Sequence, residues 1–194
     1  MKKNRTMRYE IAIGKNGMKY VLPETCDNNT LNVSFENSKL GRCLNIGFPI
    51  ELTCVHDCSC YTEKICYGSS GCFVFGDNQA NYTENYNFFM SHSIDEIVNA
   101  LNDIIKESGL ANFRFLEVGD ILNLKMLKVF IQTATDNPFV NFWCYTKKYR
   151  LVNLYCEKYG LETIPDNFVI IFSHWMNKDG TYYPMDNSFN FPTS

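Results

Sequence analysis

The sequence predicts an α/β protein built on a parallel sheet of consecutive βα units, forming either a partial barrel or an open sheet. Strand-like and helix-like segments alternate at short spacing from about residue 93 to residue 172. Hydrophobic residues make up 45% of the 194-residue chain, which suits one domain with a sizeable core. Strand–helix–strand order implies parallel pairing with right-handed crossovers. About four parallel strands would not close the complete eight-stranded barrel of that class.

The front of the chain leans toward β structure. Alternating residues over 9–13 and 18–22, with the turn signal Gly14-Lys15-Asn16-Gly17 between them, predict a β-hairpin. A further extended piece is expected over Leu31–Phe35. Asn, Gly, Ser and Tyr dominate residues 68–87, which predicts a loop there.

The back of the chain shows clearer periodicity. Ser93 followed by Glu96 fits a capping box, and the helix it opens continues at helical spacing to Gly109. The remaining elements follow in order: a strand over 113–118, a helix over about 123–135, a strand over 140–145, a helix over about 150–159 before Gly160, and a strand over 168–172.

We therefore expect one domain over residues 1–194. Its parts are a β-hairpin region (1–35), a cysteine-rich segment (36–90), the βα units (91–176) and an extended tail (177–194). Pro184 and Pro192 favour an extended tail over a helical one. Its aromatic residues would either pack on the core or dock a partner, and packing is the expectation.

Polar residues follow three consecutive predicted strands. Ligands in parallel α/β folds bind outside the carboxyl ends of the strands, where loops and helix N-termini converge. Asp120, Lys147 and His174 stand at these ends and are the candidate catalytic residues, with Gly119 and Asp120 as candidate cofactor contacts. The alternative is that polar residues begin at strand ends for structural reasons alone, and that Lys147 is a surface lysine.

Five of the nine cysteines fall within 19 residues. These five are the candidate metal ligands: Cys54, Cys58, Cys60, Cys66 and Cys72. Close thiolates from one loop suit zinc or an iron–sulfur cluster. The spacing is not that of a zinc ribbon, and it differs by one residue from that of radical S-adenosylmethionine enzymes. The spacing therefore does not identify the metal. The alternative is a set of reduced, partly buried thiols.

Other cysteines and the nearby histidine have plainer interpretations. Four cysteines lie scattered along the chain and are expected to be small buried hydrophobes: Cys26, Cys43, Cys144 and Cys156. His56 could serve as a ligand, but a lone histidine in a loop is more often solvated.

Charge and hydropathy narrow the compartment and the partners. The basic start leads into Tyr9-Glu10-Ile11 rather than a long apolar run, so it is not a secretory signal. No stretch approaches the roughly 20 apolar residues of a membrane span. We expect a cytoplasmic protein with reduced thiols and no membrane partner. The net charge of −3 argues against nucleic acid as a direct non-specific partner.

Several motifs follow one another over roughly residues 36–176. They are Asn37-Ser38-Lys39-Leu40-Gly41, Asn45-Ile46-Gly47-Phe48-Pro49, Thr53-Cys54 through Cys60 to Cys66-Tyr67, Phe113-Arg114-Phe115 to Gly119-Asp120-Ile121, Phe142 to Thr146-Lys147-Lys148-Tyr149, and Phe172-Ser173-His174-Trp175. In this order they resemble a phage and prophage family, the gene product 88 domain family. The resemblance would place the protein in the cytoplasm of a bacterial host.

The family is distantly similar to radical S-adenosylmethionine proteins. That similarity implies that Cys54, Cys60 and Cys66 hold a cluster, and that the Gly119-Asp120 turn meets the amino group of S-adenosylmethionine. The chain departs from the family pattern after Arg114, where Phe115 and Leu116 replace a Trp-His pair. Chemistry that needs that histidine is therefore put in doubt.

Two functions of different classes follow. In the first, a phage or mobile-element protein carries a cysteine-ligated metal or iron–sulfur site, with Asp120, Lys147 and His174 at its mouth. In the second, it is a non-catalytic binding protein that inhibits a bacterial defence system such as a CRISPR effector. Its partner would then be a host protein, and any metal would be structural.

Overall fold

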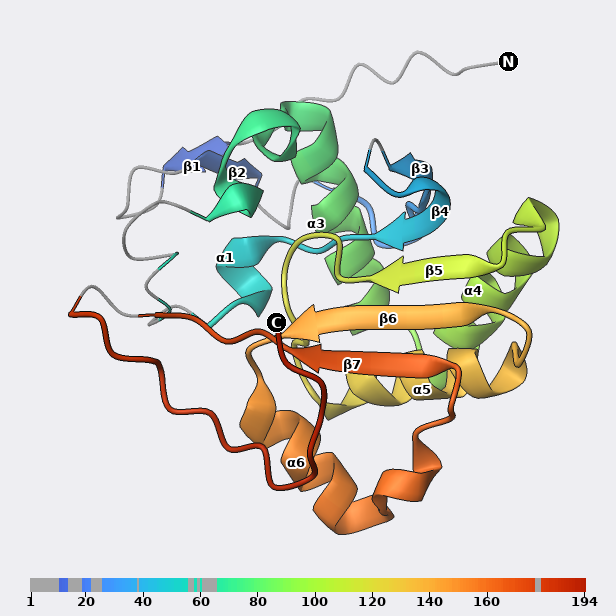
Figure 1. Ribbon diagram of the computed structural model, residues 1–194. Helices are drawn as coiled ribbons and strands as arrows, with labels where there is room; N and C mark the ends of the chain where they lie inside the picture. Colours follow the sequence, from blue (N-terminus) through green and yellow to red (C-terminus); the bar gives the residue numbers. More distant parts are fainter. Residues whose placement is uncertain are drawn as a thin grey trace.

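A mixed α/β sheet structure organises the chain (Figure 1). The computed structural model describes residues 11–13, 19–21, 26–37, 39–55, 58, 60, 66–176 and 179–194. In these residues, five strands form one sheet in the order β3-β4-β5-β6-β7, and β1 pairs with β2 apart from it. The strands of the main sheet are β3 (Ser34–Asn37), β4 (Gly41–Ile46), β5 (Asn112–Phe115), β6 (Asn141–Thr146) and β7 (Phe168–Phe172).

The parallel part of the sheet agrees with the predicted βα order. Strands β4 to β7 are parallel neighbours, and only the β3–β4 pair is antiparallel. Helix α5 (Leu124–Asp136) connects β5 to β6, and α6 (Tyr149–Tyr159) connects β6 to β7. The sequence predicts β5 to β7 but not β4. Its Gly41-Arg42 start and buried Asn45 hide the apolar pattern of a strand.

The N-terminal hairpin is confirmed as an antiparallel pair, β1 (Ile11–Ile13) with β2 (Lys19–Val21). The predicted turn at 14–17 and the outer ends of both predicted strands lie outside the described residues. The predicted extended piece appears three residues later, as β3. The sheet order therefore starts from an antiparallel edge and continues in parallel.

The loop expected over residues 68–87 is wrong from Gly76 onward, where a helix begins. This stretch contains the short 3-10 turns η2 (Tyr67–Ser69) and η3 (Gly71–Val74) and most of α3 (Gly76–Ser91). Asparagine is a weak helix former, so the composition predicted a loop. In the structure, asparagine side chains of α3 bond to distant backbone groups instead. Asn85 donates to the carbonyl oxygens of Asn32 and Gly47, at 2.9 Å each.

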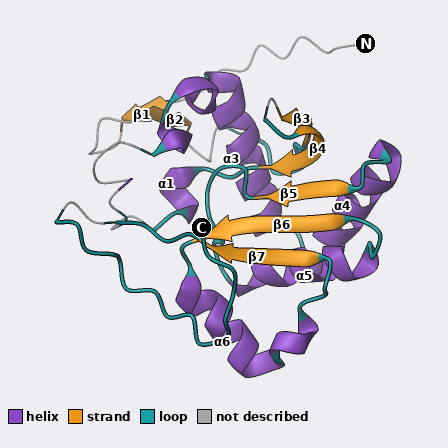
Figure 2. Ribbon diagram, in the orientation of Figure 1, coloured by secondary structure: helices purple, strands orange, loops and turns teal. Residues whose placement is uncertain are grey.

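Helices cover one face of the parallel strands. In Figure 2, α4 (Ile94–Ser108) and α5 lie behind the sheet, and the described helices leave the front of β5 to β7 uncovered. The covered face is aromatic and buried: Phe115 stacks on Phe130 of α5 at 4.2 Å between ring centroids. The opposite face carries Arg114, Trp143 and Tyr145, all at least partly exposed.

Strand β5 ends earlier than the sequence predicts. It stops at Phe115, because Leu116 takes a left-handed backbone conformation with φ of 61°. A bulky residue rarely adopts this conformation. The chain beyond it still follows β4, since the Glu117 amide donates to the Ile46 carbonyl oxygen and the Phe48 amide to that of Val118. The turn that follows β5 thus curls back over the carboxyl end of β4.

The tail closes against the last strand. Phe191 is buried and stacks on Phe172 at 4.8 Å, and Thr193 makes a parallel bridge to Phe172. Trp175 stacks on Tyr183 at 4.1 Å. The tail therefore packs on the core, with its aromatic side chains as the contacts. No helix in the described part of the chain is long and apolar enough to cross a membrane.

Candidate functional site

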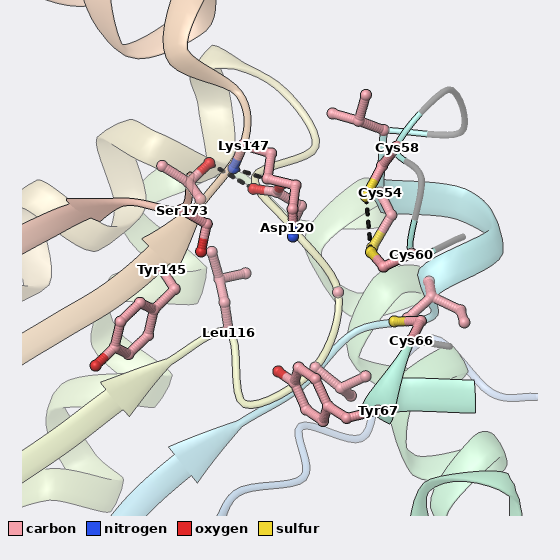
Figure 3. A pocket seen from close by; sticks show the side chains of 15 residues that line it. Cys54, Cys58, Cys60, Cys66, Tyr67, Leu116, Asp120, Tyr145, Lys147 and Ser173 are labelled. Carbon is pink, nitrogen blue, oxygen red and sulfur yellow. Dashed lines mark hydrogen bonds between the residues drawn. The ribbon is translucent and has the colours of Figure 1, made fainter. Parts of the chain in front are cut away.

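A cavity of about 80 Å³ lies at the carboxyl ends of the parallel strands. Its wall joins two sets of residues that are far apart in the sequence. Figure 3 shows the cysteines on one side and residues from the strand ends on the other. The residues with ionisable or nucleophilic groups in its lining are Cys54, Cys58, Cys60, Cys66, Tyr67, Asp120, Tyr145, Thr146, Lys147 and Ser173.

The cysteines reach the cavity through a short helix and a set of turns. Helix α1 (Ile50–Thr53) follows the carboxyl end of β4 and ends when the Cys54 amide donates to the Ile50 carbonyl oxygen. The Cys66 amide donates to the Cys60 carbonyl oxygen at 3.0 Å and joins the two ends of the cysteine loop. Residues 56, 57, 59 and 61–65, including the candidate ligand His56, lie outside the described residues.

Hydrogen bonds between the thiols link three of the cysteines. The sulfur atoms of Cys58 and Cys60 lie 2.7 Å apart, and Cys60 also bonds to Cys66. The bond from Cys60 lowers the pKa of Cys66 to about 6, helped by the Gly68 amide and by the charge of Lys147. Burial raises the pKa of Cys54. The hydrogen bonds to Cys58 and Cys66 raise the pKa of Cys60, so the Cys60–Cys66 pair favours negative charge on Cys66 and the proton on Cys60.

The Gly119-Asp120 turn packs tightly against helix α1 and the residues just before it. Gly119 has a φ of +86°, and a side chain there would meet the Phe48 carbonyl oxygen at 2.6 Å. The Asp120 amide donates to the Thr53 hydroxyl at 3.0 Å, and that hydroxyl donates to the Pro49 carbonyl oxygen. Only glycine fits this approach, because both the left-handed backbone and the contact exclude a Cβ.

The Asp120 carboxylate is buried and bonded on both oxygens. One oxygen accepts from the Thr146 hydroxyl at 2.5 Å and from the Ile121 amide at 2.7 Å. The other accepts from the Lys147 amide at 2.9 Å. Burial raises the pKa of Asp120, while these hydrogen bonds act in the opposite direction. The carboxylate thus ties the turn after β5 to the end of β6.

Lys147 and His174 occupy different positions relative to the cavity. Lys147 lines it, with its ammonium 5.3 Å above the Trp175 ring. Its charge adds to the lowering of the pKa of Cys66, whereas burial raises the pKa of Cys54 and the hydrogen bonds to Cys58 and Cys66 raise that of Cys60. His174 is exposed, stacks on Tyr182 at 4.3 Å and does not line the cavity. The strand ends do converge, but Ser173 rather than His174 is the member from β7.

The five candidate ligands do not all meet. Four of them line the cavity, whereas Cys72 is exposed in η3 and lies outside its lining. Among the described residues, no three His, Cys, Asp or Glu side chains are already spaced as a metal-ligand set. The four thiols line one cavity, and those of Cys58, Cys60 and Cys66 are joined by hydrogen bonds. Of the scattered cysteines, Cys43, Cys144 and Cys156 are buried and Cys26 is partly buried.

Several residues of this site were not predicted from the sequence, among them Tyr67, Tyr145 and Leu116. Tyr67 donates from its hydroxyl to the Glu117 carbonyl oxygen at 2.6 Å, Tyr145 closes the opposite side, and Leu116 lies between them (Figure 3). A left-handed leucine cannot be read from the sequence. Tyr145 carried a signal, because it is the last residue of a predicted strand, where polar groups were already expected.

A comparison with protein families decides what this chain is related to. The gene product 88 family matches residues 18–190, nearly the whole chain. The chain belongs to the gene product 88 family. This is a phage-type domain family, so the resemblance seen in the ordered motifs is confirmed and extends beyond residues 36–176. A search of the curated proteins and of the solved structures found no match.

Proposed function

We propose that this gene product 88 protein carries a thiolate-ligated metal ion or iron–sulfur cluster at the carboxyl end of its sheet. Cys54, Cys58, Cys60 and Cys66 would hold it. The observation that supports this is the convergence of these four thiols on one cavity, opposite the Gly119-Asp120 turn. The site lies where parallel α/β folds bind their ligands.

The chemistry of the donor set supports a metal. Thiolates are the ligands that zinc and iron–sulfur clusters take, and four cysteines suffice for either. The hydrogen bonds among Cys58, Cys60 and Cys66 are made by protons that a metal cation would displace. Lys147 adds a positive charge that stabilises thiolates. A bound metal would supply Lewis-acid or electron-transfer chemistry.

The volume of the cavity separates the candidate cofactors. About 80 Å³ accommodates a small group, whereas small-molecule sites are usually on the order of 300–1,000 Å³. The cavity therefore supports a metal ion more directly than S-adenosylmethionine. If S-adenosylmethionine binds, Gly119 and Asp120 remain its proposed contacts. Asp120, Lys147 and Ser173 would line the mouth toward a substrate, and His174 would reach it only after leaving Tyr182.

One preparation tests this proposal. The protein is purified without oxygen and analysed for iron, zinc and sulfide and for its visible spectrum. Near-stoichiometric metal supports the site, and iron with sulfide assigns a cluster. Protein that contains no metal after expression in zinc- and iron-supplemented medium, with all nine thiols titratable, refutes it.

Single substitutions then assign the ligands. Ser replacements at Cys54, Cys58, Cys60 and Cys66 should each lower the metal content. Cys72→Ser is the matched control, because Cys72 is exposed and outside the cavity. Retention of metal by all four cavity variants would overturn the ligand set. Loss of metal in Cys72→Ser would show that Cys72 is also a ligand.

A second candidate is the non-catalytic binding protein that inhibits a bacterial defence system such as a CRISPR effector. The observation in its favour is a pair of exposed apolar side chains where the tail begins, Met176 (56% exposed) and Tyr182 (59%), beside the exposed His174. Affinity capture of a purified CRISPR effector tests this surface. The wild type should capture the effector, and Tyr182→Ser should not. Capture that Tyr182→Ser leaves unchanged would contradict the assignment.

A further inference from the structure

The uncovered face of the sheet carries a cation, Arg114, whose side chain has few bonding partners among the described residues. Arg114 lies in the middle of β5, on the face opposite the buried Phe113 and Phe115. Within the described residues its side chain makes one long hydrogen bond, from Nη2 to the Glu117 carbonyl oxygen at 3.5 Å. Its Nε atom is buried and has no hydrogen-bond partner in the part of the chain that the structure describes. A guanidinium has five donors in a fixed fork, so most of its hydrogen-bonding capacity is unused.

The position of Arg114 connects it to the mouth of the cysteine cavity. Its guanidinium lies 5.8 Å from the ring centroid of Tyr145, which lines the cavity. The Glu117 carbonyl oxygen that it contacts also accepts the hydroxyl of Tyr67, on the other side of that mouth. Arg114 therefore stands between two residues of the cavity lining.

The carboxylate of Glu117 is engaged elsewhere. It accepts from the side-chain amide of Asn37 at 3.0 Å, toward β3, while Arg114 bonds to the main-chain oxygen of Glu117. Leaving a partly buried guanidinium with an unsatisfied buried donor is unfavourable unless something else bonds to it. An oxyanion offers the planar, two-point acceptor that a guanidinium matches best.

We propose that Arg114 binds the carboxylate or phosphate group of a small substrate that enters the cavity over Tyr145. The binding of an oxyanion follows from Arg114 itself, and its assignment as substrate rests on the proposed function. Tyr145 holds the guanidinium plane by a cation–π contact, and Lys147 adds a second positive charge inside the mouth. The substrate class is thus anionic.

A nuclear magnetic resonance titration of the full-length protein tests the subsite directly. The probes are inorganic phosphate and acetate, added separately at constant ionic strength, and the signal is the Nε–H resonance of Arg114. A saturable shift is expected. Tighter binding of phosphate indicates a phosphorylated substrate, and tighter binding of acetate a carboxylic acid.

Three variants show whether the side chain is responsible. Arg114→Gln should weaken binding of the preferred anion by about tenfold or more, measured from the amide signals of Tyr67 and Tyr145. Arg114→Lys keeps the charge but loses the forked set of donors. Its affinity for the anion should fall between those of the wild type and Arg114→Gln. Arg42→Gln removes the same charge from the exposed start of β4 and should leave binding unchanged. Thermal unfolding of each variant shows that it is folded.

The outcomes separate this inference from the metal site. If Cys54→Ser loses metal but still binds the anion through Arg114, the subsite stands independently. If the wild type contains metal but neither anion gives a saturable shift, the inference is wrong and the proposed function is untouched. Equal binding by wild type and Arg114→Gln also overturns it. In either case a water bridging Arg114 to Asn45, whose buried amide oxygen lacks a partner on the neighbouring strand, explains the buried donor.

Discussion

Helices α3 and α4 follow each other directly in the chain but are stabilised in different ways. Helix α4 has a capping box at Ser93, buries Ile97, Val98, Leu101 and Ile105 on one face, and ends at a left-handed Gly109. Helix α3 has no side-chain cap and buries polar residues, including Thr83, Glu84 and Asn85, among its apolar ones. One helix is determined by its own sequence, the other by what surrounds it.

The comparison of the two helices shows where buried polar side chains stabilise this fold. The buried side chains of α4 need only an apolar neighbour, which α5 provides. The side chains of α3 instead bond to specific backbone groups. Gln79 donates to the Phe73 carbonyl oxygen and Asn78 to that of Cys72, while Asn85 accepts from the Asn32 amide. Helix α3 thereby positions the segments before β3 and beside the cysteine loop.

The largest effect is expected at the apolar face of α4. Leu101 is fully buried, so Leu101→Ala should lower the free energy of unfolding by about 2–5 kcal/mol, through lost apolar burial and the cavity left behind. Urea denaturation followed by circular dichroism measures it. Leu154→Ala on α6, where the side chain is 46% exposed, is the control and should cost far less. Equal losses would show that α4 does not depend on its buried face.

The polar face of α3 should respond nearly as strongly. Asn85→Ala removes three hydrogen bonds and leaves buried backbone groups of Asn32 and Gly47 unsatisfied, at a cost of roughly 2–3 kcal/mol. The same substitution at Asn99, exposed on α4, should be neutral or slightly stabilising, because alanine is the better helix former. Similar stability of the two variants in urea would contradict the comparison.

The helix starts offer a smaller test. Ser93→Ala removes the capping box of α4 and should cost about 1 kcal/mol. Phe75, 64% exposed at the start of α3, makes no cap, so Phe75→Ser should stabilise the protein by up to about 1 kcal/mol. Both changes are read from the midpoint of thermal unfolding. A loss of stability in Phe75→Ser would mean that this ring makes contacts more valuable than a cap.

The smallest change in stability, but a clear change in reactivity, is expected at Lys147. Its charge helps to hold the pKa of Cys66 near 6, so Lys147→Gln should move that pKa upward. With metal chelated, the alkylation rate of Cys66 by iodoacetamide falls as pH decreases through its pKa, and the variant should show this fall at higher pH. Lys106→Gln, exposed on α4, should leave the profile unchanged. An unshifted profile in Lys147→Gln would show that the lysine charge is screened from the thiol.

Much of the back half of the fold was predictable, and the reason is periodicity. Helices α4, α5 and α6 and strands β5 to β7 bury apolar side chains at regular intervals against one shared core. Their predicted ends fall within one to three residues of those observed, because caps such as Ser93, Asn123 and Gly160 are local signals. The convergence of the polar residues that follow these strands at one edge of the sheet was predictable from the same order of elements.

The sequence by itself determined the parallel βα order, the family-type motifs and a cluster of thiols near the front of the chain. Only the tertiary structure decided that α3 is a helix, that β4 joins the sheet, and that Cys72 and His174 stay outside the cavity while Tyr67 enters it. These outcomes depend on contacts across long separations: Asn32 and Asn85 are 53 residues apart, and Tyr67 and Glu117 are 50 apart. A local pattern records how a residue suits its own helix or strand. It does not record which distant backbone atom will satisfy a buried amide or which strand end will face a thiol.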